Sequence, residues 1–284
     1  MFFPLLKRWR IFLLTLLVVG ALLAGQAFYV EPSRLIVKSY QLPIAGMPPL
    51  RIAALSDLHV GAPHITRTKL QQVVQMTNAQ QPDLIVLLGD YVIQGVVGGS
   101  FVEPREIAED LRALQAPLGV YGVLGNHDHR YNGKKISQEF SRVGIHMLDH
   151  HTQRLEWRGV SFWLMGLGDF FKDPSNWRAV IAQVNDAAPI IAITHNPDVF
   201  AELPPRVNLM LAGHTHGGQC NFPWFGRPIV PSMYDDRYAI GLVYENGHHI
   251  FITPGIGTSI LPVRFRVTPE ISLIQFKPEE DRKD

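Results

Sequence analysis

The sequence has only one cysteine, Cys220, among its 284 residues. One cysteine cannot form an intrachain disulfide, so a disulfide-stapled scaffold is excluded. The sequence also lacks internal repeats and low-complexity tracts, because its 24 Gly and 21 Pro are spread along the chain. With 46% hydrophobic residues, we expect one compact globular domain with a full core.

A strong excess of charge is absent as well. The formal net charge is +1, and residues 11–284 carry 23 Lys and Arg against 25 Asp and Glu once the three basic residues of the first ten are left out. This balance predicts no nucleic-acid binding.

The N-terminal segment is the one long stretch without charge. Residues 11–30 are uncharged and almost entirely apolar, which is long enough to cross a bilayer. Lys7, Arg8 and Arg10 precede this run, which predicts that the N-terminus stays in the cytoplasm and the rest of the chain lies on the far side. We expect residues 1–30 to be a basic flank and single transmembrane anchor; a signal peptide cleaved near "AGQA" (24–27) is the alternative.

After a linker expected over 31–48, the region 49–276 alternates strand-like and helix-like segments. Helical apolar spacing occurs in 66–80, 104–116 and 175–187. Near-continuous hydrophobic runs alternating with helices predict a layered α/β fold, and the helix-poor C-terminal part predicts an antiparallel edge. A charged tail is expected over 277–284. The runs with strand length and composition are 51–55, 84–88, 120–124, 160–166, 190–194, 208–212, 239–244, 249–253 and 271–276.

Polar side chains that can bind metals follow five of these predicted strands. In an α/β sheet the carboxyl ends of the strands are where ligands bind, so residues distant in sequence should converge there. Each cluster alone is weak, because a single Asp after a strand is usually a helix cap or turn residue. The residues are Asp57 and His59, Asp90, Asn126 with His127 and Asp128, His195, and His214 with His216.

The ligand types indicate two divalent metal ions. Seven of the residues offer oxygen or imidazole nitrogen and none offers a thiolate, which suits Mn, Fe, Zn or Co and argues against a cysteine-rich zinc site. Seven ligands are too many for one ion but sufficient for two at about 3.5–4 Å if a carboxylate bridges them. Asp90, on a Gly-Asp turn in the middle of the set, is the expected bridge, able to give one oxygen to each ion.

The blocks "SDLH" (56–59), "GD" (89–90), "GNHD" (125–128), a single His after a strand (His195) and "GHTH" (213–216) resemble the calcineurin-like metallophosphoesterase superfamily in order and spacing. The segments "GHTHGGQ", "RYAIGL" and "PGIGTSILPVRFRVTPEISLI" further resemble its membrane-anchored bacterial phosphodiesterases of the YaeI and YkuE kind. The resemblance implies two packed mixed β-sheets flanked by helices. Together with the basic flank, it predicts that the protein lies in the bacterial inner membrane with the domain on the periplasmic or extracytoplasmic side.

The resemblance also implies roles for the site residues. Asp57, His59 and His216 would bind one metal together with Asp90, and Asn126, His195 and His214 would bind the other with the same Asp90. His127 would face the substrate phosphate as the catalytic group, and Asp128 behind it would orient its ring. The metals would be Mn²⁺, with Fe, Zn, Co or Ni as alternatives.

The expected activity is hydrolysis of a phosphodiester or pyrophosphate bond by a hydroxide that bridges the two metals. The anchor suggests that the substrate is lipid-linked. Three alternatives stay open: a non-catalytic metal-dependent scaffold at the membrane, a dimetal amidase or protease, and the nucleotide-diacylglucosamine pyrophosphohydrolase of lipid A synthesis, whose cytoplasmic substrate conflicts with the expected orientation. The sequence leaves the oligomeric state open.

Other polar residues match no block. Asp169 ends a strand and could cap a turn or contact substrate, and His129 lies close in sequence to the site. Arg227, Arg237, Arg264 and Arg266 could bind phosphate or lipid headgroups, although solvated positions are commoner. We expect the remaining histidines to be solvated at the surface: His64, His146, His150, His151, His248 and His249.

Overall fold

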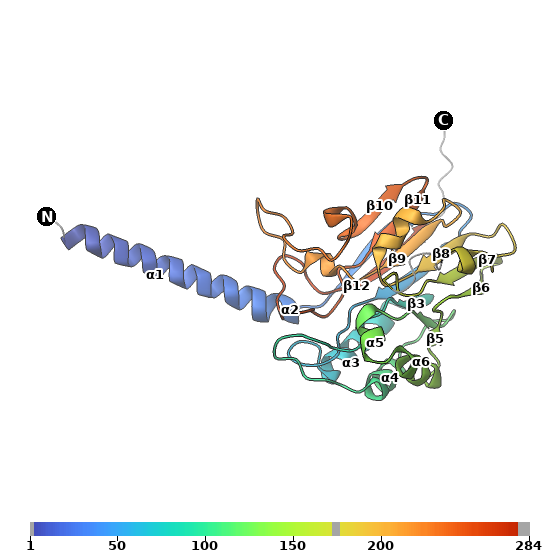
Figure 1. Ribbon diagram of the computed structural model, residues 1–284, viewed down its shortest axis with the longest axis horizontal. Coiled ribbons are helices and arrows are strands. Elements are labelled where there is room, and N and C mark those ends of the chain that lie inside the picture. Colours follow the sequence, from blue (N-terminus) through green and yellow to red (C-terminus); the bar gives the residue numbers. More distant parts are fainter. Residues whose placement is uncertain (1–2, 172–176, 278–284) are drawn as a thin grey trace.

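Two six-stranded mixed sheets pack face to face in the computed structural model, which describes residues 3–171 and 177–277 (Figure 1). The first sheet has the spatial order β1 (Ile36–Pro43), β12 (Glu270–Lys277), β2 (Arg51–Leu55), β3 (Leu84–Leu87), β4 (Val120–Gly122) and β5 (His146–Met147). The second has the order β10 (Gly241–Glu245), β11 (His248–Ile252), β9 (Leu209–Ala212), β8 (Ile190–Ile193), β7 (Val160–Gly166) and β6 (His151–Trp157).

The strands that lead into the predicted site are parallel to one another within each sheet. β2, β3, β4 and β5 are parallel, as are β7, β8, β9 and β11. Antiparallel pairs occur at β10–β11, β6–β7 and β12–β2, so the antiparallel edge predicted for the C-terminal strands is confirmed. Parallel strands end at one edge of their sheet, which brings the loops after β2, β3 and β4 together.

The core between the sheets is made by the hydrophobic strands themselves. Ile52, Val86, Ile193 and Leu211 are fully buried in this layer. Their strands are buried on both faces, which explains the continuous hydrophobic runs in the sequence.

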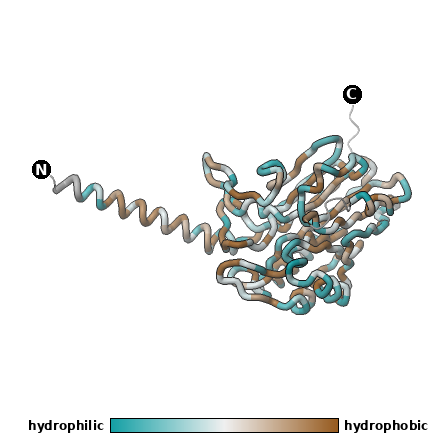
Figure 2. The backbone as a smooth tube through the Cα atoms, viewed as in Figure 1, coloured by the Kyte–Doolittle hydropathy of each residue, from teal (hydrophilic) through white to brown (hydrophobic). Residues whose placement is uncertain are grey.

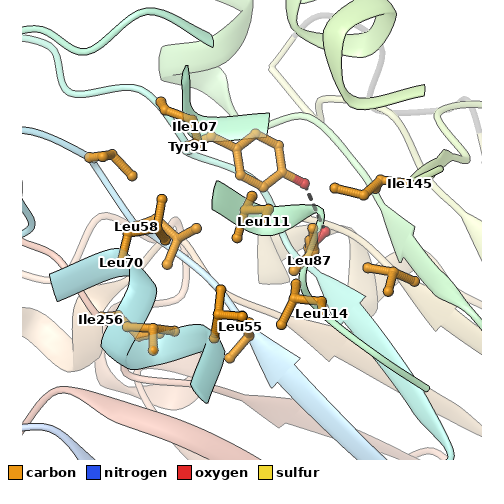
Figure 3. Close-up of a cluster of buried hydrophobic side chains, with 14 of the residues drawn as sticks. Leu55, Leu58, Leu70, Leu87, Tyr91, Ile107, Leu111, Leu114, Ile145 and Ile256 are labelled. Atoms are coloured by element: carbon orange, nitrogen blue, oxygen red, sulfur yellow. Dashed lines mark hydrogen bonds between the residues drawn. The ribbon is translucent and has the colours of Figure 1, made fainter. Parts of the chain in front are cut away.

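Helices cover the outer face of the first sheet. α3 (Arg67–Asn78), α4 (Pro104–Leu111) and α6 (Gly133–Arg142) bury their apolar faces against it. α3 begins where the Thr66 side chain accepts a hydrogen bond from the Lys69 N–H. Figure 3 shows this layer, in which the hydroxyl of buried Tyr91 donates to the Leu87 carbonyl.

Shorter elements complete the fold. α5 (Asn126–Tyr131) follows β4 directly, and α7 (Trp177–Ile181) packs near β6 and β7. The expected start of the third helix at Ser175 lies outside the described residues, as does the charged tail after Lys277. The remaining turns are the 3-10 segments η2 (Pro197–Glu202), η3 (His216–Gly218) and η4 (Asp235–Tyr238).

The segment 31–48, expected to be a linker, contains strand β1. All eight of its residues pair with β12 in parallel register, from Ile36 opposite Glu270 to Pro43 opposite Lys277. The Tyr40 hydroxyl donates to the Glu270 carboxylate at 2.9 Å. β1 is an edge strand with polar residues on its open face, so its hydrophobicity is too low to identify it from sequence.

A long apolar helix projects from the domain (Figures 1 and 2). α1 (Phe3–Gly25) continues through the π-helical turn η1 (Gln26–Val30) into α2 (Glu31–Ser33). Of the helices in the described part of the chain, this is the one that is long and apolar enough to cross a membrane, and its apolar window is fully exposed.

Candidate metal centre

The loops that follow five strands bring the predicted metal ligands together in two buried clusters. Asp57, His59 and His216 form one group, hereafter the Asp57 cluster, and Asp90, His195 and His214 form the other, the Asp90 cluster. Within each cluster the potential ligand atoms lie within 4.8 Å of one another. The residues come from both sheets, so the site lies where the two sheets meet.

Asp90 connects the two clusters through one oxygen. Its Oδ2 lies 3.2 Å from His195 Nε2 and 3.6 Å from His59 Nε2. Its Oδ1 instead accepts the backbone N–H of His127 at 2.9 Å. We expected one oxygen for each ion, but here Oδ2 faces both clusters while Oδ1 is held by the backbone.

Asn126 extends the Asp90 cluster. Its Oδ1 lies 3.2 Å from His195 Nε2, and His214 Nδ1 lies 3.1 Å from the same nitrogen. Asn126 is the first residue of α5, so the turn from β4 into this helix places its amide at the site.

The unsatisfied polar atoms of the Asp57 cluster fit a divalent cation. In the Asp57 cluster the Nε2 atoms of His59 and His216 face each other at 3.3 Å. The buried Asp57 Oδ1 lies 3.3 Å from His216 Nε2 and accepts no hydrogen bond from the described residues. Buried polar atoms without a partner destabilise the fold unless a hydrogen bond or a cation satisfies them. A set of oxygen and nitrogen ligands is what divalent transition metals bind.

Backbone carbonyls orient two of the imidazole rings from behind. His195 Nδ1 lies 2.7 Å from the Leu88 carbonyl, and His59 Nδ1 lies 3.3 Å from the Val92 carbonyl. A carbonyl at Nδ1 fixes the proton there and leaves Nε2 free to bind a metal, as is usual for metal-binding histidines.

Most of the ligand residues have a strained backbone. Positive φ values occur at Asp57 (54°), His59 (41°), Asp90 (55°), His214 (71°) and His216 (51°). Such conformations are uncommon for residues other than glycine and concentrate at functional sites. The glycines beside them leave no room for a side chain: a Cβ at position 125 would lie 2.1 Å from Asp90 Oδ1.

The comparisons with known proteins agree with this geometry. The model of the family described as calcineurin-like phosphoesterase matches residues 50–218, which include every predicted metal ligand. The chain belongs to this family. It is 30% identical to the uncharacterized metallophosphoesterase YkuE of Bacillus subtilis, over 92% of this chain and 93% of that one.

Two further relatives carry names that refer to an activity. Phosphodiesterase YaeI of Escherichia coli is 30% identical over 80% of this chain and 82% of its own. UDP-2,3-diacylglucosamine pyrophosphatase LpxG of Chlamydia trachomatis is 26% identical over 93% and 95%. The crystal structure of a candidate 5′-nucleotidase from Staphylococcus aureus superposes with a TM-score of 0.51 at 11% identity, covering 74% of this chain and 49% of that one, which confirms the fold.

The charge states in this calcineurin-like phosphoesterase suit metal binding. Burial lowers the pKa of His59 to about 4 and of His214 to about 3, and it holds the pKa of His216 well below its usual value. These rings are therefore neutral at pH 7, which is the form that binds metals. Burial would raise the pKa of Asp90, but His195, His59 and His127 together outweigh burial and hold that pKa well below the usual range.

His195 is the exception among the histidines. Burial would lower its pKa, but Asp90, Asp57 and the Leu88 carbonyl together outweigh burial and raise it to about 10. A cation that enters the Asp90 cluster would therefore take the place of this proton.

His127 lies beside the clusters and belongs to neither. Its ring is partly exposed and meets the His59 ring edge-on, with 4.9 Å between the centroids. Its Nδ1 has no hydrogen-bond partner among the described residues. That the His127 ring faces a substrate phosphate stays a prediction.

Asp128 contacts the backbone and not the His127 ring, contrary to our expectation. Its buried carboxylate accepts the backbone N–H groups of Asp90, Tyr91, Val92 and Gly125 at 2.8–3.2 Å. No hydrogen bond joins it to the His127 ring in the described structure. Asp128 is the third residue of α5, and its carboxylate points back toward the start of that helix, where the Asp90 turn lies. Asp128 therefore positions the Asp90 turn.

Arg264 and His248 are buried, which corrects two expectations of solvated positions. The Arg264 guanidinium donates to the carbonyl oxygens of Pro254, Gly257 and Val267, so it is unable to bind phosphate. Burial lowers its pKa to about 10. His248 stacks on Phe200 with 4.3 Å between ring centroids.

Asp169 caps a turn, and a neighbouring aromatic residue contacts the site. The Asp169 carboxylate accepts the Phe171 N–H at 3.0 Å. The Phe171 ring, 59% exposed, lies edge-on to the His214 ring at 5.7 Å between centroids. We did not predict the position of Phe171; the sequence feature that could have indicated it is the aromatic pair directly after Asp169.

His129, the other residue close in sequence to the site, is half-buried on α5.

Proposed function

We propose that the protein is a membrane-anchored phosphodiesterase that uses two divalent metal ions to hydrolyse a phosphodiester or pyrophosphate bond. The position of Asp90 Oδ2, which faces His195 at 3.2 Å and His59 at 3.6 Å, carries the proposal. A carboxylate oxygen that faces both ligand clusters could be shared by two cations, which supports a dinuclear centre.

Each ligand would have a defined place. Asp57, His59 and His216 would bind one cation and Asn126, His195 and His214 the other, with Asp90 shared by both. Mn²⁺ suits this donor set, with Fe, Zn, Co or Ni as alternatives. When bound, the two cations would supply a water of lowered pKa as the nucleophile and would neutralise charge on the phosphoryl oxygens.

His127 would act on the substrate directly. Its backbone is fixed by the hydrogen bond to Asp90 Oδ1, so its ring is held beside the shared carboxylate while one side stays open. We propose that this ring donates a hydrogen bond to a phosphoryl oxygen or a proton to the leaving oxygen.

The names of the relatives and the helix support the substrate class. YaeI is named a phosphodiesterase and LpxG a pyrophosphatase. Both names denote cleavage of a phosphate group that is linked to two other groups. The apolar helix α1 supports a substrate in or near the membrane, such as a phospholipid or a lipid-linked nucleotide sugar.

Similarity to LpxG along 93% of this chain favours a second candidate, cleavage of a nucleotide-diacylglucosamine of lipid A synthesis. The basic flank before α1 counts against it, since it places the domain outside the cytoplasm where such a nucleotide is made.

The arrangement of the chain follows from these proposals. The basic flank stays in the cytoplasm, α1 crosses the bacterial inner membrane once, and the phosphoesterase domain of residues 49–276, with β1 at its edge, lies on the extracytoplasmic side. Thr268 donates to the Glu31 carboxylate and the Arg264 N–H to the Ala27 carbonyl, which fixes the segment between α1 and β1 to the domain.

The test is hydrolysis of bis-p-nitrophenyl phosphate against p-nitrophenyl phosphate by the full chain in detergent, after chelation and after Mn²⁺ is added back. We expect metal-restored cleavage of the diester, with less of the monoester, and loss of both metal and activity in Asp90→Asn. His127→Ala should retain its metal content and lose activity. Bound metal without turnover of either compound would refute the proposal and favour the scaffold.

A further inference from the structure

Three loops of the domain end in exposed apolar side chains. They are 92–102, 219–233 and 254–267, hereafter the apical loops. The side chains of Trp224 and Phe225 are 98% and 84% exposed, and Ile260 is 68% exposed. Val97, Phe222, Ile229 and Leu261 are exposed beside them. Large apolar side chains this open to solvent usually mark an interaction surface.

The apical loops contain no acidic residue. Loop 92–102 has no charged residue at all, and the only charges in the other two are Arg227, Arg264 and Arg266. Arg264 is buried, which leaves Arg227 half-buried and Arg266 exposed. An apolar surface with only positive charge suits the interface of an anionic bilayer.

The three loops are joined to one another and to the base of the anchor helix. The Val97 N–H donates to the Ile260 carbonyl at 2.9 Å, and the Asn221 N–H donates to the Phe265 carbonyl at 2.9 Å. The Arg264 N–H donates to the carbonyl of Ala27, in η1, at 2.9 Å. In Figure 1, loop 92–102 (teal) and loop 219–233 (orange) extend toward the side from which α1 projects.

The junction between helix and domain is held by side chains. Thr268 donates to Glu31 Oε1 at 2.6 Å, and Gln26 donates to Glu31 Oε2 at 2.9 Å. Glu31 is buried. A flexible linker would let the domain turn away from the bilayer, whereas this junction keeps the apical loops next to the point where α1 leaves it.

We propose that the apical loops insert their apolar tips into the interface of the bilayer that α1 crosses, so that the domain lies on the membrane surface. This inference rests on the proposed anchoring by α1. The occupant is lipid because the surface is continuous with the base of the anchor.

Such contact would also bring the metal clusters close to the bilayer. Loop 219–233 begins next to the ligand His216, and Arg227 Nε donates to the Gly217 carbonyl at 2.9 Å. Loop 254–267 contacts the other side of the site, where the Gly257 N–H donates to the Asp57 carbonyl at 2.6 Å. A phosphodiester carried on a lipid would therefore reach the site while its acyl chains stay in the membrane.

The test places a fluorophore at the tip of one loop. In full-length protein with Cys220→Ser, the variant Trp224→Cys is labelled with the environment-sensitive dye NBD and reconstituted into phosphatidylethanolamine–phosphatidylglycerol vesicles. The matched control is Glu156→Cys, an exposed position on β6 at the end of the domain away from α1 (Figure 1). Vesicle flotation is measured on the same samples.

We expect a blue-shifted emission that is quenched by doxyl-labelled lipid at position 224, and water-like emission without quenching at position 156. Protein that floats with the vesicles but gives water-like emission at both positions would overturn insertion of the loops while leaving the anchor in place. Protein that does not float would overturn the anchoring, and the inference with it. Metal content, which neither substitution should change, reports that the variants are folded.

Discussion

Asp128→Asn should weaken the fold and the metal site together, because the Asp128 carboxylate supports four backbone N–H groups. Oδ1 accepts from Tyr91 at 2.9 Å and Val92 at 3.2 Å, and Oδ2 accepts from Asp90 at 2.8 Å and Gly125 at 2.9 Å. Asparagine has only one side-chain oxygen. Its amide nitrogen would point two hydrogens at two N–H donors in a fully buried position.

The size of the effect follows from the number of bonds lost. Two buried N–H donors lose their acceptor, and each buried donor left unsatisfied costs about 1–3 kcal/mol, so we expect a loss of about 2–6 kcal/mol. For a domain of this size each kcal/mol lowers the Tm by about 2–4 °C, so the Tm should fall by roughly 4 °C or more. The Asp90 turn loses its support in the same substitution, so metal content should fall as well.

The assay is thermal unfolding of the full chain in detergent, followed by its metal content measured by mass spectrometry. His127→Ala is the matched control, since it truncates the neighbouring side chain without touching the four N–H groups, and it should keep both Tm and metal. If Asp128→Asn instead keeps its Tm and metals and loses only turnover, as His127→Ala should, the carboxylate acts through the ring and the backbone role is refuted.

Two further substitutions test the surroundings of the Asp57 cluster. Gly255→Ala, at φ +68°, would place a Cβ 2.7 Å from the Asp57 Cβ, so metal content should fall. The control Gly144→Ala has a similar φ of +89° and no atom within 4 Å, so it should cost about 1–2 kcal/mol of backbone strain and leave metal binding unchanged; equal metal loss in both would contradict the steric argument. Arg264→Met leaves three buried carbonyl groups without their donor and should destabilise the fold by about 3 kcal/mol or more, measured by Tm. Arg266→Met, at an exposed position, should change stability by less than about 0.5 kcal/mol, and equal effects of the two would show that the Arg264 hydrogen bonds contribute little.

The strand-end positions of the predicted ligands could be anticipated because two simple rules combine at them. Buried parallel strands show in the sequence as hydrophobic runs, and the carboxyl ends of such strands share one edge. Asp57 and Asp90 follow neighbouring parallel strands of one sheet, so their convergence needed no knowledge of the packing between the sheets. His195 follows β8 of the other sheet, so its place beside them depends on how the two sheets pack.

The features that were missed depend on partners far away in the sequence. β1 pairs with β12 more than 200 residues later, and its polar open face gives it no hydrophobic run. The acceptors of Arg264 are backbone carbonyls, which every residue has, so nothing in the sequence marks them. The role of Asp128 was missed for the same reason, because its hydrogen-bond donors are backbone N–H groups that only the fold brings near. In the sequence, the one nearby side chain that it could be expected to contact is that of His127.

The contacts among the ligand loops explain why so many ligand residues keep a strained backbone. Each strained residue with positive φ costs about 1–3 kcal/mol, so other interactions must hold it in place. Here the loops hold one another: the Asp57 N–H donates to the Gly89 carbonyl at 3.0 Å and the His59 N–H to the Asp90 carbonyl at 2.9 Å. Across the sheets, the His214 N–H donates to Asp57 Oδ2 at 3.1 Å. The distances between the predicted ligands are therefore set by the packing of one sheet on the other, and a substitution that shifts the sheets should change metal affinity even when it lies far from the site.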